Sequence, residues 1–321
     1  MYKVIMAPTE GSDSEKAALS VAAKLAHRFD AELRLVRVLS APIGIENVHR
    51  PPVLEITEET LHEERLARLR KLEALGTEVS GLGDIRVLTA LEDGPVAPTL
   101  RDYAKEFNVD LIVMSSHSRG GIKRVTLGSV TDYLIRHTNI AVLVVRPPAS
   151  FIGPTREETV SRIVVPLDGS TLAQEILPHV AALGLQLNAT VSLLRVLTPS
   201  TYAQKQILQP GLPWWDADIA EAEAYLADAA SFLTEQGVAA NKEVILSDNV
   251  ADAILDFATR RRADLLAIAT RGSGGMSRFV FGTVADEVTR RSPTSLLVFH
   301  PKMATIAGEI DVAESQILAG A

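Results

Sequence analysis

The chain contains no cysteine, so disulfide bonds and thiolate zinc sites are excluded. Aromatic residues make up only 5% of it, so its cores must be built from valine, leucine, isoleucine and alanine. No apolar run approaches the roughly 20 residues that span a bilayer, and no signal-peptide pattern precedes the first predicted strand. The net charge of −8 disfavours a general nucleic-acid or anionic-membrane surface. These absences predict a cytoplasmic protein without nucleic-acid binding or a membrane span.

What the chain does contain is a long internal repeat. Residues 110–121 return as residues 264–275, and each copy runs from an apolar strand pattern into a glycine-rich turn. Residues 2–12 likewise match residues 160–170. A period of about 150 residues is the size of a compact domain rather than of a solenoid repeat. We therefore expect one domain over residues 1–147, a linker over 148–160, a second domain over 161–301 and a tail over 302–321.

Apolar runs rich in β-formers alternate with helical stretches in both copies. Strands are expected near residues 2–7, 33–39, 85–89, 110–114 and 140–145, and near 161–166, 190–197, 242–247, 264–269 and 294–299. Helices are expected near 13–29, 57–75, 95–108 and 127–137, and near 171–184, 216–236, 249–262 and 281–291. This alternation predicts an α/β fold with parallel sheets. Ser12 and Ser170 are placed to cap the helices that follow them.

The unusual residues follow the first and fourth strands of each copy. Ligands of open parallel sheets bind beyond the carboxyl ends of the strands, where the strand order reverses. Small residues let the backbone approach a phosphate, and a helix N-terminus offers free amides. An alternative is that the glycines only shape a tight strand-to-helix turn. The second-copy residues expected at such a site are Pro166, Leu167, Asp168, Ala269, Arg271, Gly272, Gly282 and Thr283.

Catalytic and metal-binding signatures are missing. The chain has no phosphate loop with its lysine, no G-x-S-x-G elbow and no H-E-x-x-H pair. Its seven histidines share no metal-ligand spacing, so we expect no metal site and no catalytic residues. Trp214 and Trp215 follow the second strand of the second copy, and they either cover the second crevice or pack against the neighbouring domain.

With these motifs the chain resembles the universal stress proteins, specifically the tandem members, over almost all of residues 1–301. The resemblance implies two tandem Rossmann-like domains of the adenine nucleotide alpha hydrolase-like type. Each would have a five-stranded parallel sheet in the order 3-2-1-4-5. The ATP-binding branch carries G-x2-G-x9-G-[ST] after strand four and an Asp at the end of strand one. In the second copy this pattern falls on Ala269, Gly272, Gly282 and Thr283, with Asp168 as the acid.

In the first copy the same pattern is more altered. Two of its glycines are serines and a glutamate replaces the aspartate, so this site depends on a backbone that needs no positive φ there. The resemblance also implies that the backbone after each second strand, at Val38 and Val196, meets the adenine. The first-copy residues implied are Pro8, Thr9, Glu10, Val38, Ser115, Ser118, Gly128 and Ser129.

The resemblance implies a stress-response regulator that binds ATP, ADP or AMP without efficient catalysis, with Mg²⁺ able to accompany the phosphates. Nucleotide occupancy would then alter a surface for an unidentified protein partner. The alternatives are a scaffold that binds no nucleotide and a slow ATP hydrolase. The fifth strands, residues 140–145 and 294–299, are expected to pair edge to edge as an intramolecular pseudo-dimer. Dimerisation of the whole chain is common in the family.

Overall fold

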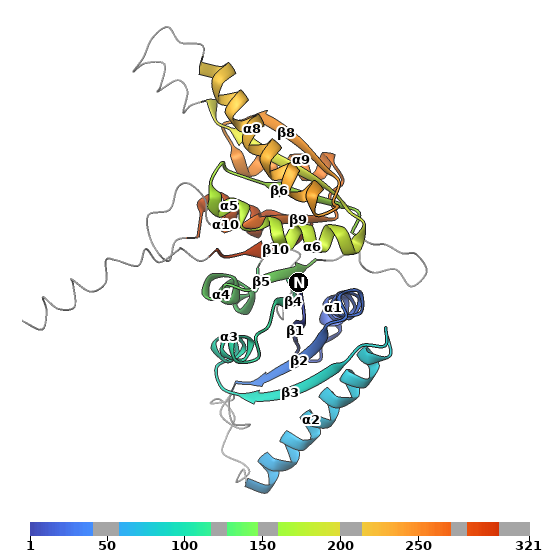
Figure 1. Ribbon diagram of the computed structural model, residues 1–321. Helices are drawn as coiled ribbons and strands as arrows, with labels where there is room; N and C mark the ends of the chain where they lie inside the picture. Colours follow the sequence, from blue (N-terminus) through green and yellow to red (C-terminus); the bar gives the residue numbers. More distant parts are fainter. Residues whose placement is uncertain (41–57, 117–126, 147–159, 200–213, 271–280, 302–321) are drawn as a thin grey trace, which may run out of the picture.

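The computed structural model describes residues 1–40, 58–116, 127–146, 160–199, 214–270 and 281–301, which are built around one ten-stranded sheet (Figure 1). The strands of the first half are β1 (Val4–Pro8), β2 (Glu32–Leu39), β3 (Val87–Asp93), β4 (Leu111–Ser115) and β5 (Ala141–Val145). Those of the second half are β6 (Arg162–Pro166), β7 (Thr190–Leu197), β8 (Ala240–Leu246), β9 (Leu265–Ala269) and β10 (Ser295–Phe299).

The sheet runs in the order β3-β2-β1-β4-β5-β10-β9-β6-β7-β8. All neighbours within a half are parallel, so each half has the predicted order 3-2-1-4-5. The two halves join where β5 and β10 pair antiparallel, with Leu143 opposite Leu297. The predicted pairing of the fifth strands is therefore confirmed, and we call this junction the seam. It turns two potential free edges into the middle of one sheet.

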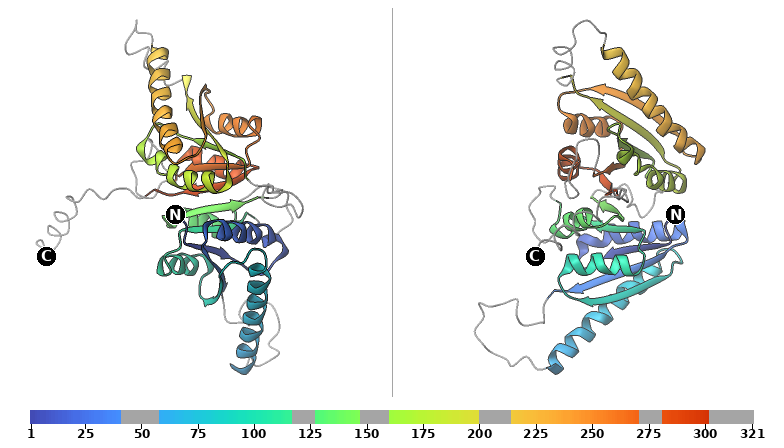
Figure 2. Two further views of the ribbon diagram at one scale, coloured as in Figure 1. Left: turned by 45° about the vertical axis from the view of Figure 1, so that its right-hand side comes forward. Right: turned by 60° about the vertical axis from the view of Figure 1, so that its left-hand side comes forward.

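Helices cover both faces of the sheet (Figure 2). The first half contributes the 3-10 turn η1 (Asp13–Glu15) and the helices α1 (Lys16–Phe29), α2 (Glu58–Ser80), α3 (Val96–Glu106) and α4 (Ser129–His137). The second half contributes α5 (Thr171–Gln174), α6 (Leu177–Leu187), α8 (Trp214–Glu235), α9 (Val250–Arg260) and α10 (Thr283–Arg291). Core side chains from α1, α2, α6 and α8 gather on one face, and those from α3, α4, α9 and α10 gather on the other.

Both cores continue across the seam. In β5, Leu143 belongs to the cluster on one face, while Val142 and Val144 belong to the cluster on the other. Successive strand residues point to opposite faces, so a strand covered on both sides must be apolar throughout. Among the buried hydrophobic side chains of the described residues, four are aromatic: Tyr2, Tyr103, Phe257 and Phe281. As the composition predicts, aliphatic side chains fill most of both cores.

Two local predictions were wrong. The helix expected over 171–184 is two helices, α5 and α6, because Pro178 in the first turn of α6 has no amide to continue a helix. Ser12 makes no capping hydrogen bond. Its hydroxyl lies 2.8 Å from that of Ser14, and the segment that follows Ser12 is the 3-10 turn η1 rather than an α-helix. In addition, α2 extends to Ser80, beyond the expected end. The tail over 302–321 and all of the predicted linker except Val160 lie outside the described residues.

Four charged side chains form a closed ring across the seam, which we call the seam ring. Arg136 Nη2 in α4 lies 2.6 Å from Asp286 Oδ1 in α10, and Arg290 Nη2 in α10 lies 3.6 Å from Asp132 Oδ1 in α4. Within the helices, Arg136 Nε donates to Asp132 at 3.0 Å and Arg290 Nε donates to Asp286 at 2.9 Å. The aspartates and the arginines are equivalent positions of the repeat, so the ring follows the pseudo-twofold symmetry of the chain.

Candidate functional site

The second half brings most of the predicted site residues to one edge of the sheet. Strands β6 and β9 are parallel neighbours, with Ile163 opposite Leu265, so their carboxyl ends leave the sheet side by side. The start of α10 is held at the same place, because the Gly282 amide donates to the carbonyl of Thr270 at 2.9 Å. The residues gathered at this edge are Pro166, Leu167, Asp168, Ala269, Gly282 and Thr283. The predicted residues Arg271 and Gly272 lie outside the described part of the chain.

The turn after β6 holds the acid in place. Gly169 has a φ of +89°, a left-handed conformation that favours glycine. Asp168 Oδ1 accepts hydrogen bonds from the Ser170 amide at 3.0 Å and from the Ser170 hydroxyl at 2.6 Å. Ser170 Oγ in turn accepts from the Ala173 amide at 3.1 Å, which confirms the predicted cap. The carboxylate is thus oriented by the turn that follows it.

Two further side chains brace this turn and were not predicted as site residues. Arg195 from β7 donates to the Leu167 carbonyl at 3.5 Å, and a Cβ on Gly169 would lie 3.0 Å from Arg195 Nη2. Tyr225 from α8 donates to the Ser170 carbonyl at 2.8 Å. Burial raises the pKa of Tyr225 to about 12, and the charge of Asp168 acts in the same direction. The phenol therefore stays a donor at neutral pH.

Only Arg195 leaves a trace in the sequence. It occupies the same place in the repeat as Arg37, and Arg37 also approaches its turn, with Nη1 3.6 Å from where a Cβ on Gly11 would lie. Tyr225 lies on a long helix and far from the turn in sequence, so no local pattern marks it.

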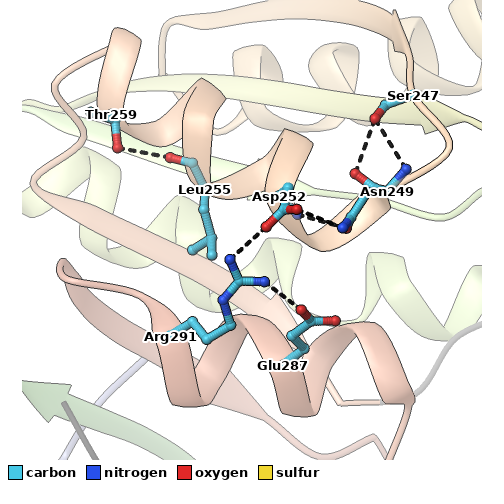
Figure 3. A network of polar contacts seen from close by, with 7 residues as sticks. All are labelled: Ser247, Asn249, Asp252, Leu255, Thr259, Glu287 and Arg291. Atoms are coloured by element: carbon cyan, nitrogen blue, oxygen red, sulfur yellow. Dashed lines mark hydrogen bonds and ion pairs between the residues drawn. The ribbon is translucent and has the colours of Figure 1, made fainter. Parts of the chain in front are cut away.

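The N-terminus of α10 has no side-chain cap. Its N-cap is Gly282, and the first turn closes with the Asp286 amide donating to the Gly282 carbonyl at 2.8 Å. The amides of the intervening residues have no intrahelical acceptor, and Thr283 is exposed beside them. By contrast, the neighbouring helix α9 is capped by Asn249, whose Oδ1 accepts from the Asp252 amide at 3.1 Å (Figure 3). An uncapped helix start of this kind can receive an anion.

Arg291 links α10 to α9 through an ion pair. Arg291 Nη2 lies 2.5 Å from Asp252 Oδ1, and its Nη1 contacts Glu287 one turn earlier in α10 (Figure 3). Asp252 also accepts from Asn249 Nδ2 at 2.5 Å, so the cap of α9 and the anchor of α10 share one carboxylate. The uncapped N-terminus of α10 therefore belongs to a helix that is held at its other end.

The first half closes its corresponding turn with its own carboxylate. Glu15 Oε2 accepts from the Thr9 hydroxyl at 2.7 Å, the Glu10 amide at 2.9 Å and the Gly11 amide at 3.2 Å. The equivalent of Glu15 in the second half is Ala173, which carries no charge. The turn after β1 therefore already has an anion on its amides.

The other first-half residues are placed as their counterparts are. Strands β1 and β4 are parallel neighbours, so Pro8 and Ser115 end at the same edge. Gly128 and Ser129 begin α4, again without a side-chain cap. Ser118 lies outside the described residues.

The residues expected near an adenine also lie at these edges. Val38 and Val196 are two positions beyond the residues that pair with Pro8 and Pro166, near the ends of β2 and β7. Both are half-buried. Trp214 and Trp215 begin α8, but their side chains are not among those described, so their two alternatives stay open predictions.

Three further features bear on other classes of site. Within the described ranges, no group of three or more histidine and carboxylate side chains could hold a metal ion. No helix in that part of the chain is both long and apolar enough to span a bilayer. A hollow of about 480 Å³ lies at the opposite, amino-terminal edge of the first half. Two of its lining residues, Glu32 and Arg86, pair with each other at 3.2 Å, and Glu32 also lies 2.7 Å from Arg34.

Comparison with known proteins identifies the family. The model of the universal stress protein family matches residues 1–146 and 159–300, so the chain belongs to this family as a tandem member. A universal stress protein of Mycolicibacterium smegmatis is 25% identical over 306 residues, covering 93% of this chain and 97% of its own. One of Methanocaldococcus jannaschii is 30% identical over 148 residues, covering 46% of this chain and 84% of its own.

A solved structure supports the fold over most of the chain. A universal stress protein from Archaeoglobus fulgidus superimposes with a TM-score of 0.63 over 92% of this chain and 98% of its own, at 15% sequence identity. The two tandem α/β halves predicted from the repeat agree with the two segments that the family model matches.

Proposed function

We propose that this chain is a regulatory protein of the stress response that binds one adenine nucleotide, ATP, ADP or AMP, at the carboxyl edge of its second half. The observation that carries the proposal is the meeting of Asp168 at the end of β6 with the uncapped start of α10 at Gly282 and Thr283. The phosphates would accept from the amides of α10, and Mg²⁺ can accompany them. Asp168 would accept from a ribose hydroxyl, since a carboxylate is an acceptor for such groups.

The chemistry of the described residues fits this ligand. Arg195 contacts the turn that carries Asp168, and it supplies positive charge at the edge where an anion would approach. The Thr283 hydroxyl is exposed at the helix start and can donate to a phosphate oxygen. The backbone of Val196 lies near the same edge, which suits recognition of an adenine through main-chain groups.

The second half is favoured over the first because its turn carries one carboxylate, Asp168, whereas the turn after β1 carries two, Glu10 and Glu15. The Glu15 carboxylate accepts from the amides of Glu10 and Gly11, which places a second negative charge within the turn that would face the nucleotide. The negative charge of Glu15 would repel the phosphates of a nucleotide bound at this turn. We therefore expect one nucleotide per chain rather than two.

A matched pair of substitutions tests this assignment. Asp168→Ala is expected to weaken ATP binding at least tenfold, because the ribose acceptor is lost, whereas Glu10→Ala at the equivalent position of the first half leaves it unchanged. Fluorescence titration with a labelled adenine nucleotide measures both, and circular dichroism confirms that both variants fold. Equal loss in the two variants, or loss in Glu10→Ala alone, would reject the second half as the site.

A scaffold without nucleotide is the second candidate, and the altered first half favours it. If both crevices are vestigial, neither substitution changes any binding signal, because the unsubstituted chain gives none. We further propose that the bound nucleotide is not efficiently turned over, since no activated nucleophile or poised base was found in the sequence. Multiple turnovers of ATP that disappear in Asp168→Ala or Thr283→Ala would instead establish a slow hydrolase.

A further inference from the structure

The seam ring places a guanidinium of the first half at the amino end of α10. Arg136 Nη2 lies 2.6 Å from Asp286 Oδ1, and Asp286 stands in the first turn of that helix. The Arg136 guanidinium also lies 4.4 Å from the centre of the Phe281 ring. Phe281 is buried and directly precedes Gly282. Two independent contacts therefore hold Arg136 against the turn to which the proposed function assigns the phosphates.

Asp286 is an unfavourable neighbour for a phosphate. A rise of 1.5 Å per residue puts its backbone only about 4.5 Å along the axis from that of Thr283. Burial pushes the pKa of Asp286 up, but hydrogen bonds from Arg290 and Arg136 outweigh burial and hold its pKa below the usual value. The carboxylate is therefore charged at neutral pH, and its charge lies within the screening length of about 8 Å from an anion at the helix start.

We propose that Arg136 raises nucleotide affinity at the second crevice by acting from the other half of the chain, where it adds to Arg290 in compensating the charge of Asp286. This inference rests on the proposed function, which places the phosphates at the start of α10. Arg136 does not need to touch the nucleotide. Arg136 helps to compensate Asp286, the one carboxylate in the first turn of α10. The electrostatic potential at the second crevice therefore depends on a residue of the first half.

The mirror contact is weaker, which agrees with a favoured second half. Arg290 Nη2 is 3.6 Å from Asp132 Oδ1, compared with 2.6 Å for Arg136 and Asp286. The repeat equivalent of Phe281 is Leu127, which offers no aromatic face for a guanidinium. Across the seam, Asp286 of α10 is therefore paired more closely than Asp132 of α4.

Titration calorimetry of full-length variants with ATP in low salt tests this role. Arg136→Gln removes one of the two guanidinium groups that pair with Asp286, leaving only Arg290, and is expected to weaken ATP binding on the order of threefold to tenfold. Asp286→Asn removes the repulsion and strengthens binding by a similar factor. The double variant Arg136→Gln/Asp286→Asn restores the original charge balance and returns affinity close to that of the unsubstituted chain. Salt near 1 M, where the screening length falls to about 3 Å, compresses all these differences.

A purely structural role gives a different pattern. If Arg136 matters only for packing at the seam, both single variants weaken binding and the double variant does not recover it, which would overturn the inference. Arg261→Gln is the matched control, because Arg261 pairs with Glu243 and belongs neither to α10 nor to the seam ring; the ATP affinity of this variant is expected to stay within about twofold. If Arg136→Gln fails to fold, Asp286→Asn still decides, since unchanged or weaker binding in that variant contradicts the inference.

Failure of the inference and failure of the proposed function are distinguishable. An unsubstituted chain that binds no ATP overturns the proposed function and the inference that rests on it. An unsubstituted chain that binds ATP, with Arg136→Gln and Asp286→Asn both unchanged, overturns the inference alone.

Discussion

The phenol oxygen of Tyr2 lies 2.9 Å from Nδ1 of His179, although 177 positions separate the two residues in the sequence. Tyr2 precedes the first strand and His179 lies in α6, so the hydrogen bond ties the two halves together on the face opposite the seam ring. The His179 ring also packs 4.6 Å from the ring of Phe299 in β10. Burial is the main reason that the pKa of His179 falls to about 4, with Asp110 acting weakly in the opposite direction.

This depressed pKa predicts a loss of stability in mild acid. The unfolded chain takes up a proton at His179 near pH 6.5, whereas the folded chain resists it down to about pH 4. Stability from this residue is thus fully present above pH 6.5 and is lost as the pH falls through that window. Urea unfolding at pH 7.5 and 4.5 should show the unsubstituted chain losing up to about 3 kcal/mol more than His179→Gln. Parallel losses in both proteins would contradict this account.

The two serines that follow β1 and β6 should respond differently to removal. Ser170→Ala deletes an N-cap hydrogen bond to Ala173 and is expected to cost about 1 kcal/mol in the free energy of unfolding. Ser12 caps nothing and is exposed, so Ser12→Ala should stay within about 0.5 kcal/mol. Denaturant titrations of both variants measure the difference. A larger loss for Ser12→Ala would show that the first turn depends on this serine and not on Glu15.

Both halves share one contact at the amino-terminal ends of their central strands, and it gives a third prediction. Asp264 Oδ2 accepts from the amides of Ser161 and Arg162 at 3.0 and 2.9 Å, and Asp110 Oδ2 accepts equivalently from Lys3 and Val4 at 2.7 and 3.0 Å. Each carboxylate thus fixes the start of the central strand in its half. Asp264→Ala and Asp110→Ala are each expected to cost about 2 kcal/mol, because a charged acceptor shared by two backbone amides is lost.

The control for these carboxylates is Asp256, which is exposed on α9. Asp256→Ala should change the free energy of unfolding by no more than about 0.5 kcal/mol. If the three alanine variants unfold at the same denaturant concentration, the carboxylates do not anchor the strands.

The sequence predicted the architecture because its signals were local and duplicated. Continuous apolar runs such as Leu143–Val145 mark strands buried on both faces, and alternation with helices fixes a parallel sheet. The family resemblance then implied the strand order and the edge-to-edge pairing, both of which the structure confirms. The same resemblance implied the positions of Asp168 and Gly282, which do lie at one edge.

What the sequence could not predict depends on contacts between distant residues. Tyr225 reaches Ser170 from a long helix, and His179 meets Tyr2 across the seam, so neither leaves a periodic signal. The cap expected at Ser12 is missing because its hydroxyl meets that of Ser14 at the start of a 3-10 turn, a local choice that spacing does not reveal. The seam ring did leave a trace, since its two Asp–Arg pairs recur at the same positions of the repeat, but only the antiparallel seam shows that they meet.

The most direct test of the central claim is titration calorimetry of the unsubstituted full-length chain with ATP. We predict saturable binding of one nucleotide per chain with a Kd on the order of micromolar, as for a ligand held in a surface cleft. No heat and no saturation with ATP, ADP or AMP up to about millimolar concentration, the weak end of that scale, would contradict the account.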